Sequence, residues 1–264
     1  MTQQERRIFL LRTLLAEQPQ YRNMEIPQSE QAQKQLLRAL FNVRMPRETD
    51  EEFLRIQDEY LKTEIAQKGV TDYRSLASFA DGVYLWKGDI TTLRCDAVVN
   101  AANRQMLGCF YPNHGCIDNA IHTYAGVQLR SACAALMETQ GHAEQTGMAK
   151  ITPAFNLPSK YVIHTVGPVV HDSLSGQDRE LLASCYRSCL AVADENGLES
   201  IAFCCISTGE FHFPNEAAAE IAIQAVSRFR EKSSRKIEVI FNVFKELDYE
   251  IYRKLLGGYK AAEI

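Results

Sequence analysis

The sequence has no excess of basic charge, no long apolar run and no glycine before Gly69, and each absence narrows the class of protein. Its 29 lysines and arginines are outnumbered by 33 aspartates and glutamates, so it has no basic field for a nucleic-acid backbone. No apolar stretch is long enough to cross a bilayer. The first residues also lack the apolar core and cleavage site of a signal peptide. We therefore expect a cytoplasmic protein that binds neither nucleic acid nor membrane.

Residues 1–74 are rich in Gln, Glu, Arg and Leu, with apolar residues at helical spacing, and predict an N-terminal helical extension. The second of its three expected helices begins at Ser29. The third begins at a capping box of Thr49 and Glu52 and ends at Gly69. Two roles are open for this extension. It packs on the main domain, as amphipathic helices usually do and as we favour, or it covers a ligand pocket or binds a partner.

Residues 75–264 show a different pattern, in which short apolar strands alternate with helices. This alternation predicts an α/β fold with a mixed, largely parallel sheet covered by helices on both faces. Strands are expected at 83–86, 97–100, 150–155, 161–166, 200–206 and 236–244, and helices at 117–138, 177–196, 215–231 and 248–256, the last ended by Gly257 and Gly258. Ligands of such sheets bind outside the carboxyl ends of the strands.

The chain contains eight cysteines, which could indicate disulfides. In a cytosolic chain of this size they more often indicate buried thiols together with a metal or reactive site. Cys133, Cys185 and Cys189 lie on apolar helix faces, and Cys204–Cys205 lies in an apolar strand. Free cysteine behaves as a small buried hydrophobe, so these five are predicted core residues.

The most distinctive stretch is the loop 108–118, which contains Cys109, His114, Cys116 and Asp118. Thiolate and imidazole are ligands that zinc prefers, and two cysteines with one histidine are one ligand short of a closed tetrahedron. An open position would let the metal do chemistry, whereas a fourth protein ligand would make the site structural. A chance cluster of these residue types is the third alternative. The aspartate falls at the predicted start of a helix.

Three further motifs follow predicted strands, and each is weak evidence alone. Gly88–Thr91 places a carboxylate where it can accept a hydrogen bond from an exocyclic amine, or is simply a capped turn. Val99–Asn103 combines small residues with Asn amides that can bind hydroxyls, or is a turn. Ser207–Pro214 precedes a helix and offers backbone N–H groups to a phosphate. His164 is expected to be a hydrogen-bonded core residue, and His122 to pack or bond locally.

These pieces, in this order, resemble the macrodomain family, which binds ADP-ribose. The matching motifs are GDIT at Gly88, VNAAN at Val99, CIDNAIHTYAG at Cys116, IHTVGP at Ile163 and STGEFHFP at Ser207. The resemblance covers roughly residues 80–256, most of the length of one such domain. It implies a three-layer α/β/α fold for the part of the chain that follows the extension.

The resemblance also implies where the ligand lies. By motif position, Asp89 and Ile90 would hold the adenine, Phe244 would stack on it, Ser207, Thr208, Gly209, Glu210 and Phe211 would cradle the diphosphate, and Asn100 and Asn103 would approach the distal ribose. Asp118 aligns with the aspartate that hydrolytic members use near that ribose.

The chain departs from the common macrodomain pattern at one place. Most members have a Gly-rich run before the catalytic aspartate, whereas this chain has the cysteine-containing loop. This loop and the helical extension are similar to zinc-containing macrodomains of bacteria, which implies that Cys109, His114 and Cys116 bind Zn²⁺. The zinc would hold a ribose hydroxyl or the attacking water. Asp118 would orient that water or act as a base, and Asn103 would position the ribose.

The function implied by the resemblance is a zinc-dependent hydrolase that removes mono-ADP-ribose from Asp or Glu side chains of modified proteins. It would reverse a sirtuin-type ADP-ribosyltransferase, with a lipoyl-carrier protein of the glycine-cleavage type as a candidate substrate; the residues themselves show neither partner. Two alternatives are open. A non-catalytic ADP-ribose reader with a structural zinc would carry the same adenine and phosphate motifs. A thiol-redox protein would use Cys109 and Cys116 directly.

Overall fold

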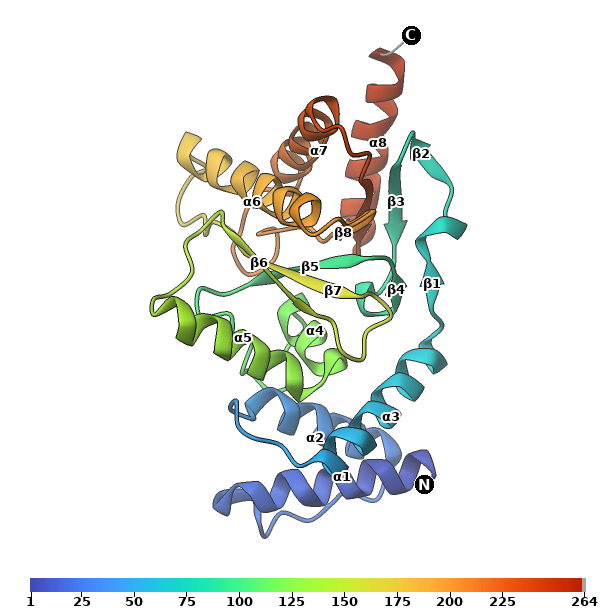
Figure 1. Cartoon of the computed structure of the whole chain (residues 1–264), viewed down its shortest axis with the longest axis vertical. Helices are drawn as coiled ribbons and strands as arrows, with labels where there is room; N and C mark the ends of the chain where they lie inside the picture. Colours follow the sequence, from blue (N-terminus) through green and yellow to red (C-terminus); the bar gives the residue numbers. More distant parts are fainter. Residues whose placement is uncertain (263–264) are drawn as a thin grey trace.

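The computed structural model describes residues 1–262 and begins with three helices that pack together (Figure 1). They are α1 (Gln3–Glu17), α2 (Glu30–Val43) and α3 (Glu51–Lys68), with a short 3-10 helix at Pro19–Tyr21. The predicted start of α2 is confirmed, since Ser29 caps it. The predicted capping box at Thr49 is wrong. Asp50 caps α3 instead, because its carboxylate directly accepts hydrogen bonds from backbone N–H groups of the first turn.

The extension has a hydrophobic core of its own. Leu11, Leu37 and Phe53 are buried in it, one from each helix, and Val127 from the following part of the chain joins the same cluster. The extension therefore packs on the main domain, as favoured above. The domain boundary between residues 74 and 75 remains a prediction.

A seven-stranded sheet follows, in the order β2-β3-β9-β8-β5-β7-β6. Its strands are β2 (Ser78–Ala80), β3 (Val83–Lys87), β5 (Ala97–Ala102), β6 (Ala149–Pro153), β7 (Tyr161–Val166), β8 (Ser200–Phe203) and β9 (Glu238–Val243). The edge strands β2 and β6 are antiparallel to their neighbours, and all strands between them run parallel. The predicted mixed, largely parallel sheet is confirmed.

A small second sheet and two 3-10 helices connect the extension to the main sheet. β1 (Thr71–Asp72) pairs in parallel with β4 (Leu93–Arg94), and the 3-10 helices lie at Tyr73–Ser75 and Ile90–Thr92. The pairing ties the chain that leaves α3 to the segment that follows Asp89.

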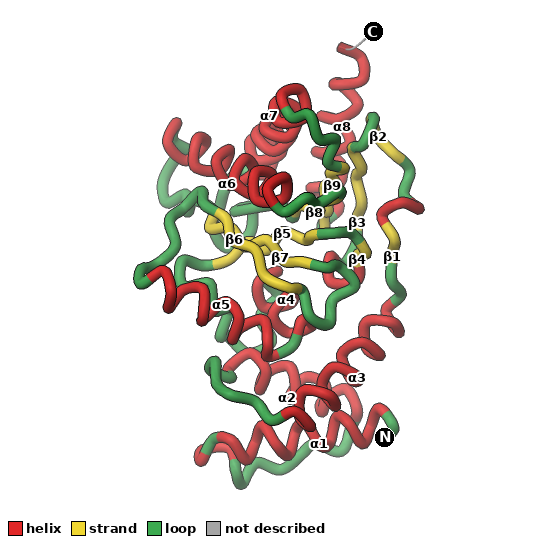
Figure 2. The backbone as a smooth tube through the Cα atoms, viewed as in Figure 1, coloured by secondary structure: helices red, strands yellow, loops and turns green. Residues whose placement is uncertain are grey.

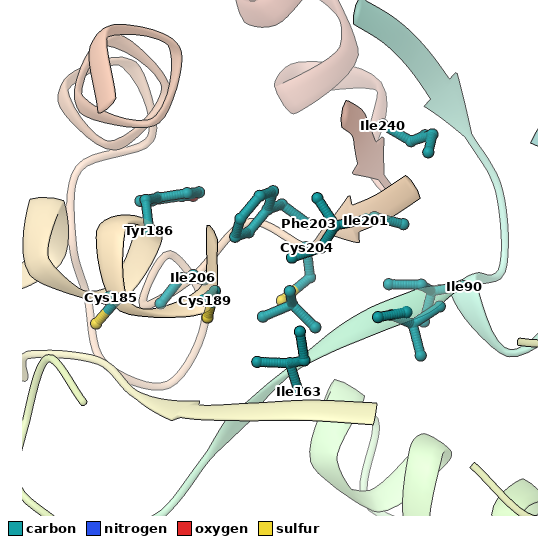
Figure 3. Packing of buried hydrophobic residues seen from close by; sticks show 14 of the residues in the cluster. Ile90, Ile163, Cys185, Tyr186, Cys189, Ile201, Phe203, Cys204, Ile206 and Ile240 are labelled. Atoms are coloured by element: carbon teal, nitrogen blue, oxygen red, sulfur yellow. The ribbon is translucent and has the colours of Figure 1, made fainter. Parts of the chain in front are cut away.

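Helices cover both faces of the main sheet (Figure 2). α4 (Ile117–Ala125) and α5 (Val127–Gln140) lie on the side of the extension, and α6 (Gly176–Glu195), α7 (Asn215–Lys232) and α8 (Glu246–Ala262) lie on the other. Ile163, Tyr186 and Phe203 belong to the continuous core beneath them (Figure 3). Full burial of side chains of this size stabilises the fold by roughly 1.5–3 kcal/mol each. The three-layer α/β/α class is confirmed.

The predicted single helix over 117–138 is wrong, because Gly126 divides it into α4 and α5. Gly126 has φ +95°, and a side chain there would lie 2.7 Å from the amide nitrogen of Gln57 in α3. The Gln57 Oε1 atom accepts a hydrogen bond from the backbone N–H of Val127 at 3.0 Å. The helix is therefore divided where the extension approaches it closely. A local sequence pattern does not predict such a contact between distant segments.

The last helix was expected to end at Gly257–Gly258, but α8 continues to Ala262. Two helical glycines cost roughly 1 kcal/mol each, and burial of Tyr252 and Leu256 on the same helix offsets that cost. Within residues 1–262, no helix is both long and apolar enough to cross a membrane.

All eight cysteines are free thiols. Four of the five that were predicted as core residues are buried, namely Cys133, Cys185, Cys189 and Cys204, and Cys205 is half-buried.

Candidate active site

The predicted motifs meet at one edge of the main sheet. β3 leads into Asp89, β9 into Phe244, β8 into the loop of Ser207, and β5 into Asn103. Since β3, β9, β8 and β5 are consecutive neighbours and run parallel, these loops follow one another along the same edge. Segments far apart in the sequence therefore form one continuous site outside the carboxyl ends of the strands.

The three candidate metal ligands converge in the loop after β5, which we call the metal loop (residues 108–116). The ligand atoms of Cys109, His114 and Cys116 all lie within 4.8 Å of one another. The Sγ atom of Cys109 is 3.6 Å from Nδ1 of His114. Gly108 and Asn113 have φ +80° and +55°, the left-handed conformation that lets the loop fold back on itself. All three side chains are half-buried, and two thiols with one imidazole suit zinc.

The metal loop also contacts the predicted diphosphate loop. With Nδ1 of His114 directed at the thiol, its Nε2 lies 3.6 Å from Oε1 of Glu210. A histidine that binds a metal through one nitrogen commonly presents the other to a carboxylate, which fixes the tautomer and the ring orientation. Glu210 thus lies where such a partner is found. Sequence reasoning had placed it at the diphosphate only.

Cys116 has a second structural role at the start of α4. Its Sγ accepts a hydrogen bond from the backbone N–H of Asn119 at 3.4 Å and so caps the helix. Burial, with a smaller effect from neighbouring Cys109, raises the pKa of the Cys116 thiol to about 12. Metal binding would therefore release a proton from this group.

Asp118 lies buried in the first turn of α4, with its carboxyl facing the end of β5. The Nδ2 atom of Asn100 donates to Oδ1 of Asp118 at 2.8 Å, and Nδ2 of Asn103 lies 3.5 Å from Oδ2. Burial raises the pKa of Asp118 to about 6, although the Asn100 hydrogen bond and the charge of Arg130 act in the opposite direction. A carboxyl with a pKa in this range suits proton transfer near neutral pH.

The two asparagines of the VNAAN motif occupy different positions. Asn100 is fully buried beneath Asp118, and its Nδ2 also lies 3.2 Å from Nδ1 of His164. Asn103 is half-buried and donates to the backbone carbonyl of Gly108 at 3.0 Å. Asn103 therefore borders the site, while Asn100 lies behind the aspartate. Their predicted approach to a ribose remains a prediction.

The loop predicted to cradle the diphosphate (residues 207–211) is fixed by backbone hydrogen bonds from Phe213 and Val170. Ser207 has φ +65°, and its carbonyl accepts from the backbone N–H of Phe213 at 3.0 Å. The backbone N–H of Val170 donates to the carbonyl of Phe211 at 2.9 Å. Within residues 1–262, the backbone N–H groups of Gly209, Glu210 and Phe211 have no hydrogen-bond partner. Free N–H groups in a tight turn are suited to an anion such as a diphosphate.

The predicted adenine end includes a residue that the sequence did not indicate. Lys68, the last residue of α3, donates to Oδ2 of Asp89 at 2.8 Å and lies 3.5 Å from the ring centroid of Tyr124. The other carboxylate oxygen of Asp89 accepts from the backbone N–H and hydroxyl of Thr91, while Ile90 is buried. Phe244 is 77% exposed, so its ring face is free to stack.

The two histidines expected in the core are both buried. His164 is hydrogen-bonded as predicted, since its Nε2 lies 3.0 Å from the hydroxyl of Thr152, and burial lowers its pKa to about 4. His122 packs under the metal loop, where a Cβ on Gly108 would lie 2.8 Å from its ring. Neither ring nitrogen of His122 has a hydrogen-bond partner among residues 1–262, and its Nε2 lies 3.6 Å from Oδ1 of Asp118 one turn earlier. The expectation that His122 packs or bonds locally is therefore met by packing. His122 and His164 also cluster with Cys133, within 4.8 Å.

The Macro domain family model matches residues 99–222 of the chain. A protein-ADP-ribose hydrolase of Treponema medium is 56% identical over 261 residues, which cover 97% of this chain and 100% of that protein. A protein-ADP-ribose hydrolase of Staphylococcus aureus strain MSSA476 is 47% identical, with 83% of each chain covered. The crystal structure of a Trypanosoma brucei macrodomain in complex with ADP-ribose has a TM-score of 0.65 at 30% identity, covering 83% of this chain and 95% of that one. The chain belongs to the macrodomain family.

Proposed function

We propose that this protein is a zinc-dependent hydrolase that releases mono-ADP-ribose from modified proteins. The observation that carries the proposal is the buried carboxyl of Asp118, which directly follows a loop of converging metal ligands and faces Asn103 at the end of β5. A module that only reads ADP-ribose needs the adenine and diphosphate contacts but has no use for this pair of features. The similarity to two proteins named protein-ADP-ribose hydrolase supports the same function.

Cys109, His114 and Cys116 would hold the zinc. Their donor atoms are soft thiolate and imidazole and lie within 4.8 Å of one another, so they could supply three of the four ligands of a zinc ion. Bound there, zinc would supply a Lewis acid and a template for the distal ribose or the attacking water. The carboxylate of Glu210 beside Nε2 of His114 would hold the imidazole in the orientation that this requires.

Asp118 would orient the attacking water and take its proton as the water oxygen bonds to C1″ of the distal ribose. The bond between C1″ and the oxygen of the modified side chain breaks in the same step, and its electron pair leaves with the carboxylate. Asn100 holds Oδ1 of Asp118 at 2.8 Å, which fixes the direction of the carboxyl. Asn103 would contact the ribose from the other side of the carboxyl.

The remaining predicted contacts would anchor the nucleotide. Asp89 and Ile90 would hold the adenine, with Phe244 stacked against it, and the free N–H groups of residues 209–211 would bind the diphosphate. Binding energy from these remote groups would place C1″ at the carboxyl and the metal.

We further propose an Asp or Glu ester as the cleaved linkage, because a carboxylate leaves without needing a proton and Asp118 would then act only as a base. A sirtuin-type ADP-ribosyltransferase as the source of the modification, and a lipoyl-carrier protein of the glycine-cleavage type as the target, rest on family resemblance. Incubation with proteins modified on acidic side chains and on arginine tests the linkage. Release from the first and not from the second is expected, and equal release would contradict it.

The hydrolase itself is tested with a protein modified on an acidic side chain. Wild-type protein should release free ADP-ribose, a chelator should stop the release, and added Zn²⁺ should restore it. Tight binding of ADP-ribose without release, with or without metal, would instead favour the non-catalytic reader with a structural zinc. Release that a chelator does not affect would remove zinc from the proposal.

A further inference from the structure

Helix α2 of the N-terminal extension lies against the outer side of the metal loop. The Nη2 atom of Arg38 donates to the backbone carbonyl of His114 at 2.9 Å. The Nε and Nη2 atoms of Arg38 also donate to Oδ1 of Asn119 at 3.1 and 2.8 Å. The planar guanidinium therefore joins the backbone of a candidate metal ligand to the first turn of α4 in one fixed geometry.

One turn further along α2, Asn42 makes a second connection. Its Oδ1 accepts from the backbone N–H of Asn113 at 2.9 Å, and its Nδ2 donates to the hydroxyl of Thr123 at 3.0 Å. Asn42 is 1% exposed, so loss of its side chain would remove a buried hydrogen bond to Thr123 and the acceptor of the Asn113 N–H. Asn113 has φ +55°, a left-handed conformation that asparagine tolerates, and the hydrogen bond from its N–H to Asn42 anchors this turn of the loop.

Two further side chains, from α4 and α5, also contact the metal loop. Asn119, which receives Arg38, donates from Nδ2 to the carbonyl of Tyr111 at 3.0 Å. Arg130 of α5 lies 4.4 Å from the ring centroid of Phe110 and donates to the carbonyl of Asn42 at 2.8 Å, at the end of α2. The metal loop is therefore held at residues 110, 111, 113 and 114 by groups that α2 contributes or contacts.

We propose that α2 is part of the active site and that Arg38 and Asn42 are positioning residues for the metal loop. This inference rests on the proposed function, because it concerns the same metal. The metal loop lies outside the helices and strands, so bringing its ligands together on metal binding would cost conformational entropy. Contacts from α2 hold the ligands close together before the metal arrives. The extension thus has a catalytic purpose in addition to packing.

Three variants test the inference in the full-length protein. Arg38→Met removes the hydrogen bonds to His114 and Asn119, and Asn42→Ala removes those to Asn113 and Thr123. Arg38→Lys keeps a hydrogen-bond donor but loses the planar guanidinium that reaches both partners. Gln35→Ala is the control, because Gln35 is exposed on the same helix. Zinc affinity is measured by competition with a chromophoric chelator, and amide hydrogen exchange of the metal loop is measured on metal-free protein. Neither readout depends on hydrolysis, and thermal unfolding checks that each variant is folded.

Arg38→Met and Asn42→Ala should weaken zinc affinity by roughly 10–100-fold, the usual effect of removing a group that orients a metal ligand. Arg38→Lys should lose less, and Gln35→Ala should match wild type. In the metal-free protein, the amide of Asn113 should exchange faster in Asn42→Ala than in wild type. Wild-type zinc affinity and wild-type loop exchange in both Arg38→Met and Asn42→Ala would overturn the inference.

Hydrolysis measured on the same samples separates this inference from the proposed function. If wild-type protein binds zinc but releases no ADP-ribose, the hydrolase is wrong, while the affinity and exchange results still support the positioning role. If hydrolysis is zinc-dependent but the Arg38 and Asn42 variants bind zinc normally, only the positioning role is wrong. Wild-type protein that binds no zinc would contradict both.

Discussion

His114 and Glu210 lie on different loops, and Nε2 of the histidine is 3.6 Å from Oε1 of the glutamate. This contact links the metal loop to the predicted diphosphate loop. The same imidazole has Nδ1 directed at the thiol of Cys109, so the ring lies between a second candidate metal ligand and a carboxylate. The two loops are thereby set relative to each other by the residue that would bind the metal.

Replacing Glu210 with Ala should weaken zinc affinity by up to roughly tenfold, because His114 would lose the carboxylate that orients its ring. Affinity for ADP-ribose should not fall, since backbone N–H groups would hold the diphosphate and a carboxylate beside it is repulsive. Chelator competition and calorimetric titration with ADP-ribose measure the two affinities. Glu216→Ala, an exposed glutamate on α7, is the control. A variant that keeps zinc but loses ADP-ribose would show that Glu210 acts on the nucleotide instead.

Asp118→Ala should lower the rate of ADP-ribose release by about 10²–10⁴-fold, the range for loss of a general base. ADP-ribose affinity should be largely kept, because the carboxyl acts on the attacking water. Single-turnover release and equilibrium binding are the two measurements, with Asp172→Ala, an exposed aspartate, as the control. Unchanged turnover would remove Asp118 from the mechanism.

Cys116 caps α4 and is also a proposed zinc ligand, and different substitutions separate these two roles. Cys116→Ser should keep the cap of α4, because a serine hydroxyl is a good acceptor at that position. It should nevertheless lose zinc and activity, since a hydroxyl is a poor zinc ligand. Cys116→Ala should lose the metal and also about 1 kcal/mol of stability from the missing cap. Metal content and urea unfolding measure the two effects, with Cys205→Ser as the control. A metal-free but fully active Cys116→Ser protein would contradict the assignment.

The buried His164 should make the fold less stable in acid. Burial lowers its pKa from 6.5 to about 4, so the unfolded chain takes up the proton first as the pH falls. His164 therefore leaves the free energy of unfolding undiminished above pH 6.5. Its contribution is lost as the pH falls from 6.5 to 4, and the free energy of unfolding at pH 5 is lower by about 2 kcal/mol. Urea unfolding at pH 8 and pH 5 measures it.

The matched variants for this test are His164→Gln and His142→Gln. His142 is exposed, so its variant should show the wild-type loss of stability between the two pH values. His164→Gln should show a smaller loss, whatever its stability at pH 8. Equal losses in wild type and His164→Gln would show that this histidine does not set the acid sensitivity.

Much of the fold could be predicted because its signals are local. The strand at Tyr161–Val166 was predicted with its observed bounds, since a β-branched apolar run between breakers is characteristic of a buried parallel strand. The errors came from contacts between distant segments. The break between α4 and α5 at Gly126 accompanies the approach of Gln57 from α3. Helix α8 continues through its two glycines because buried side chains on the same helix stabilise it.

The candidate site also contains residues that local sequence predicts and residues that depend on contacts between distant segments. Cys109, His114 and Cys116 could be singled out because few residue types bind zinc and these lie close together in the sequence. Lys68 at Asp89 and Arg38 at the metal loop could not be foreseen. Both belong to helices whose sequence predicts only packing, and Arg38 is 76 residues from His114, whose backbone it contacts. Such contacts follow from how the extension docks, which no local pattern encodes.

The most direct test of the account is anomalous X-ray diffraction at the zinc edge from crystals of the Asp118→Ala variant grown with Zn²⁺ and ADP-ribose. The account predicts one zinc bound by Cys109, His114 and Cys116, with its fourth position facing the distal ribose. A zinc closed by a fourth protein ligand and distant from C1″ would contradict it, and the nucleotide site would then belong to a receptor.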